Sequence, residues 1–82
     1  MTRTGIKIAL LRILRRMEGE PMPEAALRAG AQNMFYPAPS TAEVDTARKE
    51  LEEDGYIAGL SDDLTGVSWS LTQKGEHKAA KI

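Results

Sequence analysis

The hydrophobic pattern of this chain changes its period at Gly55, and this change constrains the fold more than any other feature of the sequence. Upstream, apolar residues recur every three or four positions, which is typical of amphipathic helices. Downstream, Val67, Trp69 and Leu71 alternate with small polar residues, which is the two-residue period of a strand. A chain of 82 residues has room for one domain. We therefore predict a single α+β domain, residues 1–82, with helices first and a small hairpin after them.

The first helix is predicted by an apolar stripe at helical spacing. The stripe consists of Ile6, Leu10, Ile13, Leu14 and Met17. Thr4 is the expected N-cap, and Gly19 is expected to end the helix because glycine tolerates a positive φ. Ile8 and Leu11 widen the stripe, which predicts that neighbours pack against more than one side of this helix.

A second helix is expected to begin near Glu24 with Pro23 at its first position, because proline favours the first helical position. Its predicted inner face consists of Leu27, Ala31 and Met34. Residues 35–39 cannot continue the helix, because the residues before the two prolines favour extended backbone. We interpret Phe35 and Tyr36 as aromatic side chains that pack under this turn, the alternative being an exposed binding patch.

The third helix has the clearest start signal in the chain. Ser40 is followed three residues later by Glu43, which is the spacing of a capping box. Its predicted buried stripe consists of Val44, Ala47 and Leu51. Gly55 supplies the residue that ends the helix with a positive φ. The second and third helices, joined by a bend, therefore form a candidate helix-turn-helix.

A hairpin and a short helix are expected after Gly55. The predicted strands cover residues 56–60 and 67–71, and the turn between them covers 61–66. Trp69 is interpreted as a core residue, because it alternates with apolar neighbours on its strand. Thr72 is the expected N-cap of the last helix, in which Gly75 is a predicted weak point.

The composition excludes several kinds of site chemistry. The chain has no cysteine, so it contains no disulfide, thiolate metal site or cysteine nucleophile. His77 is the only histidine, which excludes most histidine-based zinc sites and serine–histidine catalysis. No apolar run reaches the ~18–20 residues that span a bilayer. We expect a soluble, cytoplasmic domain without a cofactor, an enzymatic activity or a membrane partner.

Two segments in the second half of the chain resemble those of winged-helix proteins. The run Leu51-x-x-x-Gly55-Tyr56-Ile57 leads from the third helix into a strand, and Leu71-Thr72-Gln73-Lys74-Gly75 leads from the hairpin into the last helix. Small bacterial transcriptional regulators of the multiple-antibiotic-resistance and phenolic-acid-repressor types carry a similar order of helix, glycine, strand, wing and Leu-Thr-x-x-Gly. The resemblance extends from Ile6 to Lys78 and implies a winged-helix fold that binds DNA and regulates transcription.

In these regulators the third helix lies in the major groove and the hairpin tip contacts the adjacent DNA backbone. If these roles are carried over by position, the DNA-contacting residues of the third helix would be Ser40, Thr41, Asp45, Thr46 and Lys49, with Arg48 on its flank. The expected phosphate contacts elsewhere are Arg3, Lys7, Arg12, Arg15, Arg16 and Arg28, with Thr65 in the hairpin tip. Double-stranded DNA is the expected partner, and a homodimer would double the positive patch.

The distribution of charge fits DNA binding poorly at the expected reading surface. Residues 1–16 carry a net charge of +5, whereas residues 41–63 carry −6. Asp45 lies on the outer face of the third helix, and Asp62 and Asp63 lie in the hairpin tip, where they would repel phosphate. The alternative function is a winged-helix protein–protein interaction module, in which the acidic third helix and wing contact a basic protein partner. DNA binding requires the basic residues to gather on one side of the domain, whereas a protein adaptor does not.

Overall fold

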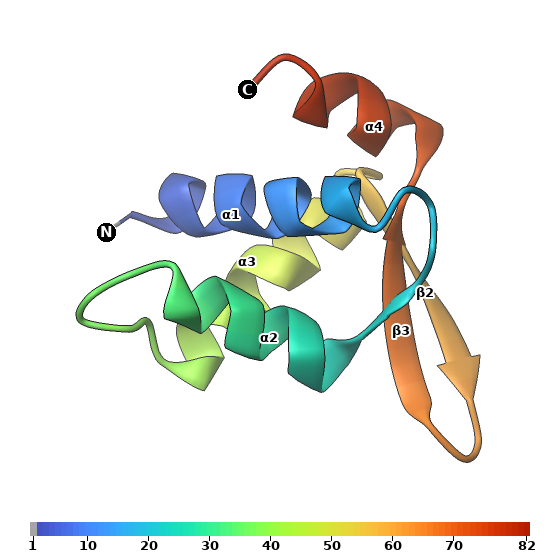
Figure 1. Ribbon diagram of the computed structural model, residues 1–82, viewed down its shortest axis with the longest axis horizontal. Coiled ribbons are helices and arrows are strands. Elements are labelled where there is room, and N and C mark those ends of the chain that lie inside the picture. Colours follow the sequence, from blue (N-terminus) through green and yellow to red (C-terminus); the bar gives the residue numbers. More distant parts are fainter. Residues whose placement is uncertain (1) are drawn as a thin grey trace.

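The computed structural model describes residues 2–82, which form helices and a small sheet around a cluster of buried apolar side chains. In chain order the elements are α1 (Arg3–Arg16), β1 (Met22–Pro23), α2 (Glu24–Asn33), α3 (Thr41–Glu53), β2 (Ile57–Asp62), β3 (Gly66–Leu71) and α4 (Gln73–Ala79). Figure 1 shows α1 between α4 and the pair formed by α2 and α3, with the β2–β3 hairpin projecting beyond the helices. This is the winged-helix arrangement predicted from the sequence, with the hairpin as the wing.

Helix α1 is the centre of the core. Ile6, Leu10 and Leu14 are each at most 2% exposed, and α1 contacts α2, α3, α4 and β3. Leu11 is also buried, at 4% exposed, although it lies outside the main stripe. The prediction that neighbours pack against more than one side of this helix is therefore confirmed.

The two ends of α1 differ in how well they follow the sequence prediction. The N-cap is Thr2, whose hydroxyl accepts the N–H of Gly5 at 3.0 Å. The prediction of Thr4 as N-cap is wrong, because the hydroxyl two residues earlier accepts one of the free N–H groups at the helix start. The helix ends at Arg16, and Gly19 follows in the turn with a φ of 90°.

Helix α2 buries a narrower face than its sequence predicts. Leu27 and Ala31 are at most 1% exposed, as expected. Met34 is 44% exposed, and its placement on the inner face is wrong because α2 ends one residue earlier. In the following turn Phe35 packs against the core, whereas Tyr36 is fully exposed. The expectation that both aromatic rings pack under the turn is therefore correct for Phe35 and wrong for Tyr36.

Helix α3 matches its prediction closely. Its buried residues are Val44, Ala47 and Leu51. Gly55 follows the helix with a φ of 81°, a conformation that favours glycine, and the chain then turns into β2. The α3–β2 junction therefore has the geometry that the sequence predicts.

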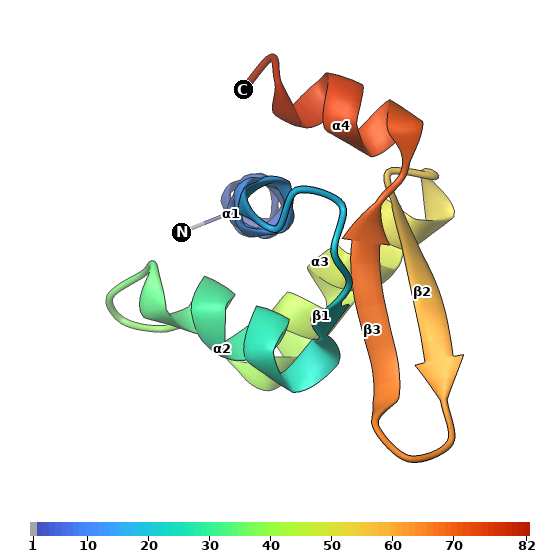
Figure 2. The same cartoon turned by 45° about the vertical axis from the view of Figure 1, so that its right-hand side comes forward.

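The sheet contains three antiparallel strands in the order β1-β3-β2. The hairpin pairs Ile57 with Leu71 at its base and Asp62 with Gly66 at its tip, so both strands extend further toward the turn than predicted. Strand β1 is not predicted from the sequence, because two residues are too few to show a period. Figure 2 shows β1 beside β3, where the loop after α1 descends toward α2.

The last helix packs closely against the base of the hairpin. The Thr72 hydroxyl accepts the N–H of Gly75 at 3.0 Å, which confirms it as the N-cap of α4. Gly75 is buried, and a Cβ there would overlap the carbonyl oxygen of Tyr56. This glycine therefore permits a close contact between α4 and the residue that leads into β2, and α4 continues through it.

Candidate nucleic-acid interface

The N-terminal end of α3 is fixed by reciprocal hydrogen bonds. The Ser40 hydroxyl accepts the N–H of Glu43, and the Glu43 carboxylate accepts the N–H of Ser40, both at 3.1 Å. This geometry confirms the predicted capping box. The first turn of α3 is exposed, so the partial positive charge of the helix N-terminus faces solvent.

The outer side of α3 carries few side chains that are free to bind a partner. Thr41 and Lys49 are exposed and make no ion pair or side-chain hydrogen bond within residues 2–82. The Thr46 hydroxyl donates to the carbonyl oxygen of Ala42 at 2.9 Å, inside the helix. Its methyl group and that of Ala42 are therefore the groups that these two positions offer to a partner.

Glu24 of α2 joins three elements beside this surface. Its Oε1 accepts the indole N–H of Trp69 at 3.3 Å and lies 3.1 Å from Nε of Arg48 as an ion pair without hydrogen-bond geometry. The Arg48 guanidinium also stacks on Trp69, 4.6 Å from the ring centroid. Arg28 donates to Asp45 at 3.3 Å and lies 3.9 Å from the other Glu24 oxygen. Arg48 and Asp45, both expected to contact DNA, thus hold α2, α3 and β3 together.

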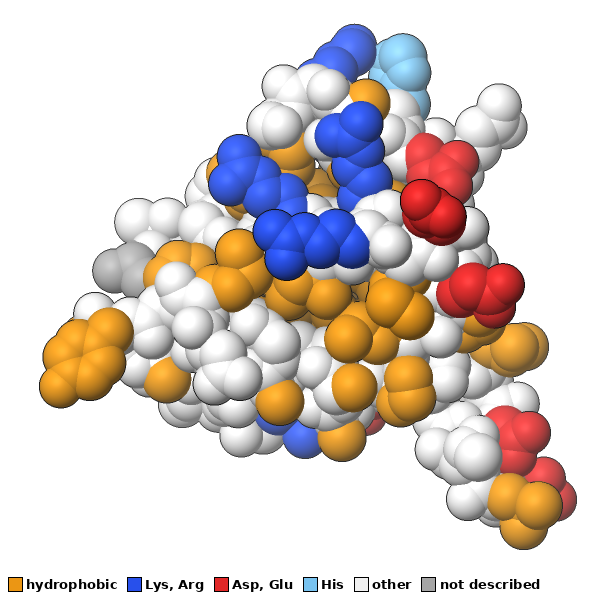
Figure 3. Space-filling view, viewed as in Figure 1, with side chains coloured by type: hydrophobic (Ala, Val, Ile, Leu, Met, Phe, Trp, Pro, Cys, Tyr) orange, Lys and Arg blue, Asp and Glu red, His pale blue; other side chains and the backbone are white. Residues whose placement is uncertain are grey.

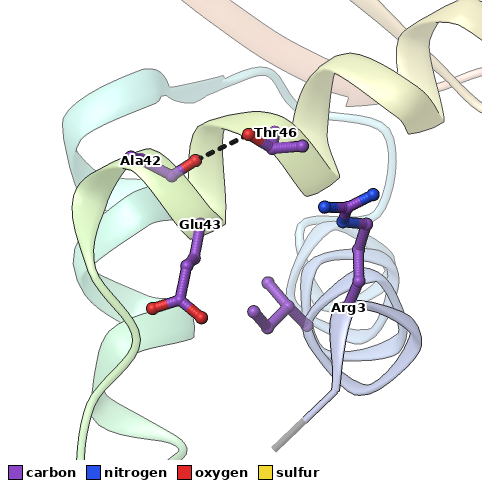
Figure 4. A pocket seen from close by; sticks show the side chains of 5 residues that line it. Arg3, Ala42, Glu43 and Thr46 are labelled. Atoms are coloured by element: carbon purple, nitrogen blue, oxygen red, sulfur yellow. Dashed lines mark hydrogen bonds between the residues drawn. The ribbon is translucent and has the colours of Figure 1, made fainter.

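A second acid, Glu50 of α3, joins α3 to α1. Its two carboxylate oxygens lie 2.9 Å from Nη1 of Arg3 and 2.7 Å from Nζ of Lys7. The hydrogen bond from Lys7, reinforced by the charge of Arg3, holds the pKa of Glu50 below its ordinary value. Figure 4 shows Arg3 of α1 and Glu43 of α3 on opposite sides of a hollow between these helices. Arg3 and Lys7 were both expected to bind phosphate, but both are paired with Glu50 of their own chain.

The remaining arginines of α1 lie on its other side. Arg12 follows Lys7 by five residues, which is a rotation of about 140° around a helix of 3.6 residues per turn. It forms an exposed basic strip with Arg15 and Arg16, and none of the three makes an ion pair within residues 2–82. Arg15 donates to the carbonyl oxygen of Ala79 in α4 at 3.4 Å. Figure 3 shows basic side chains gathered over α1 and α4 on the face drawn in Figure 1. Because Arg3 and Lys7 occupy the side of α1 that pairs with α3, the structure does not bring Arg12, Arg15 and Arg16 together with the outer side of α3.

The tip of the wing is acidic. Oδ1 of Asp62 accepts the N–H of Leu64 at 2.8 Å and that of Thr65 at 3.2 Å. These two bonds hold the pKa of Asp62 below its ordinary value, so the carboxylate stays charged. Asp63 is exposed beside it. Thr65, the residue of the tip expected to contact DNA, therefore lies next to two negative charges.

Within residues 2–82, no group of three or more histidine and acidic side chains is arranged to hold a metal ion. None of the helices in this part of the chain is both long enough and apolar enough to cross a bilayer.

No protein-family model matches the chain, and no curated protein matches its sequence. Among solved structures, the chain is similar to the crystal structure of a MarR-family transcriptional regulator from Silicibacter pomeroyi. The two share 21% sequence identity, with a TM-score of 0.77 and coverage of 94% of this chain and 47% of that one. The likeness establishes the winged-helix fold, and the chain spans about half the length of the regulator it matches.

Two residues of this surface were missed in the sequence, Glu24 and Glu50. Each neutralises two cations, and neither belongs to a motif. The only sequence signal is that Glu24 lies four residues before Arg28, the spacing of an ion pair on one helix face. The partners on other helices are far away in sequence, so they become visible only in the fold.

Proposed function

We propose that this chain is a DNA-binding domain of a transcriptional regulator and that α3 lies in the major groove of double-stranded DNA. One observation carries the proposal: the winged-helix fold leaves the outer side of α3 exposed from Thr41 to Lys49. The major groove of B-DNA admits an α-helix, and the N-terminal residues of such a helix reach the base edges. The structural likeness to a MarR-family transcriptional regulator supports the same function.

The contacts on this surface would be mostly uncharged. The hydroxyl of Thr41 can bond to a phosphate or a base, and the methyl groups of Ala42 and Thr46 suit the methyl group of thymine. Lys49 is the unpaired cation of this surface within residues 2–82. Arg28 lies beside α3 with 28% of its side chain exposed, and it can exchange Asp45 for a phosphate. We therefore expect about two phosphate contacts by cations from each copy of the chain.

A small number of phosphate contacts has a measurable consequence. Each contacted phosphate lowers log affinity by about 0.9 for each unit of log salt. Two contacts predict a slope of about −2 for one copy, and a homodimer would give about −4. A surface that used all the basic residues of the chain would give a much steeper slope.

The experiment is a fluorescence-anisotropy titration of a short labelled duplex at several salt concentrations. Lys49→Ala is expected to weaken binding and to make the slope shallower by about 0.9. Lys81→Ala is the matched control, because it removes the same charge from an exposed residue beyond α4. Absence of binding at ~50 mM salt would overturn the proposal. Equal effects of the two substitutions would show that α3 is not the contact surface.

A second candidate function, binding to another protein, is favoured by a different observation, which is the acidic tip of the wing. Asp62 and Asp63 are both exposed and lie where a DNA-binding wing would approach phosphate. This charge makes the wing better suited to a basic surface than to a DNA backbone.

A further inference from the structure

The tip of the wing presents a leucine beside two acids. Leu64 is 91% exposed, and Asp62 and Asp63 precede it. The two N–H bonds to Asp62 fix the turn that directs Leu64 into solvent. Because the turn is already ordered, docking this tip against another surface costs little conformational entropy.

A hollow with complementary chemistry lies between α1 and the segment after α2. Its lining consists of Gly5, Ile8, Ala9, Arg12, Met34 and Phe35. Arg12 is its one charged lining residue, and it has no ion pair within residues 2–82. The basic strip continues from Arg12 to Arg15 and Arg16. The hollow therefore combines an apolar floor with a positive rim.

We propose that the wing tip of one copy of this chain docks into the hollow of a second copy. Leu64 is buried there against Ile8 and Phe35, and Asp63 pairs with Arg12. The charge and the polarity of the two surfaces match, and each surface lacks a partner among residues 2–82 of its own chain. The outer side of α3 takes no part in this contact, so the contact is tested without DNA.

The geometry makes this contact head-to-tail. In Figures 1 and 2 the tip of the wing and the segment after α2 lie at opposite ends of the molecule, so a wing cannot reach the hollow of its own chain. A copy whose wing is docked still has its own hollow free. Such heterologous contacts repeat into an open series unless a rotation closes them. Association is therefore expected to grow with protein concentration.

The experiment is sedimentation velocity of the 82-residue chain without DNA, at protein concentrations up to ~1 mM. The wild-type chain is expected to associate at low salt and to dissociate at ~1 M salt, where charges are screened beyond about 3 Å. Leu64→Ser removes the apolar contact of the wing, and Arg12→Glu reverses the rim charge of the hollow. Each variant alone is expected to associate at least tenfold more weakly than the wild-type chain.

Mixing the two variants gives the sharpest result. The Arg12→Glu chain keeps an intact wing, and the Leu64→Ser chain keeps an intact hollow, so a mixture is expected to form a one-to-one complex. Asp63→Lys replaces Leu64→Ser if that variant loses its circular-dichroism spectrum, and Lys81→Glu is the control for a remote charge reversal. A wild-type chain that stays monomeric at low salt would overturn the proposal. Association that survives both substitutions, or a mixture without a complex, would also overturn it.

Discussion

Both sides of α1 carry basic side chains, but the two sides differ in whether an acid pairs with them. On the side that faces α3, Arg3 and Lys7 are both held by Glu50. On the opposite side, three arginines have no ion pair within residues 2–82, namely Arg12, Arg15 and Arg16. The comparison teaches that the position of the acids, rather than the number of bases, decides which side of this helix attracts an anion.

The same difference separates the two interaction surfaces that we propose. On the α3 side, Lys49 is without an ion pair within residues 2–82, and Arg28 must exchange Asp45 for a phosphate before it contacts DNA. Hydroxyl and methyl groups must therefore supply much of the contact. On the other side, the free arginines flank an apolar hollow that suits the acidic wing tip of another copy. The chain therefore offers different surfaces to DNA and to itself.

The largest effect is expected for a core residue on which both surfaces depend. Leu51→Ala removes a side chain that is 2% exposed, so it should lower the free energy of unfolding by about 2–5 kcal/mol. Arg12→Ala on the exposed strip should change the free energy by less than about 0.5 kcal/mol. Urea unfolding followed by circular dichroism measures both. A loss below about 1 kcal/mol for Leu51→Ala would show that this residue lies outside the core.

A smaller loss of stability is expected when the pairs beside α3 are broken. Glu24→Ala leaves the Trp69 indole N–H without its acceptor and removes the shorter of the two ion pairs of Arg48, and the cost should be about 1–2 kcal/mol because Glu24 is one-third exposed. Glu53→Ala is the matched control, since Glu53 is exposed and has no ion pair within residues 2–82. The same unfolding assay applies. Equal losses for the two variants would mean that Glu24 does not organise this surface.

The pairing of Glu50 should appear in the pH dependence of stability. Its pKa is lower in the folded chain than its ordinary value of 4.5, so its stabilising contribution is present above that value and is lost as the pH falls through the folded pKa. Glu50→Gln should therefore be less stable than the wild-type chain at pH 7, and the difference should shrink as the medium becomes acidic. A constant difference from pH 7 down to about pH 2 would contradict this pairing.

Freeing the paired cations should also change DNA binding. Glu50→Gln releases Arg3 and Lys7 on the α3 side, so the slope of log affinity against log salt should steepen, by up to about 2 units if both contact phosphate. The control is Glu76→Gln on α4, which removes the same charge away from α3. The titration described for Lys49→Ala measures the slope. An unchanged slope would show that the α1 side of α3 does not approach DNA.

The fold could be predicted largely from local signals. The capping box of α3, the positive φ of Gly55 and the alternation around Trp69 are properties of a few neighbouring residues, and the structure confirms each of them. Strand β1 could not be predicted, because its two residues pair with β3 far along the chain. Tyr36 was misplaced because its apolar ring gives no sign of the direction in which a turn points it.

The candidate interface was less predictable, for a physical reason. The residue types expected at a DNA surface are present, but their availability depends on ion pairs between elements. Arg28 and Arg48 meet acids of α3 and α2 across helix contacts, and no sequence spacing reveals such pairs. The hollow beside Arg12 likewise depends on where the segment after α2 lies relative to α1.

The most direct test of the difference between the two sides of α1 is a map of the DNA contacts by ¹H–¹⁵N NMR. A short duplex is titrated into the labelled chain at a protein concentration low enough to keep it monomeric. We expect the amide signals of residues 40–49 to shift most, while those of Arg12, Arg15 and Arg16 stay in place. The opposite pattern, with the largest shifts in the arginine strip, would contradict the assignment of α3 as the DNA-binding surface.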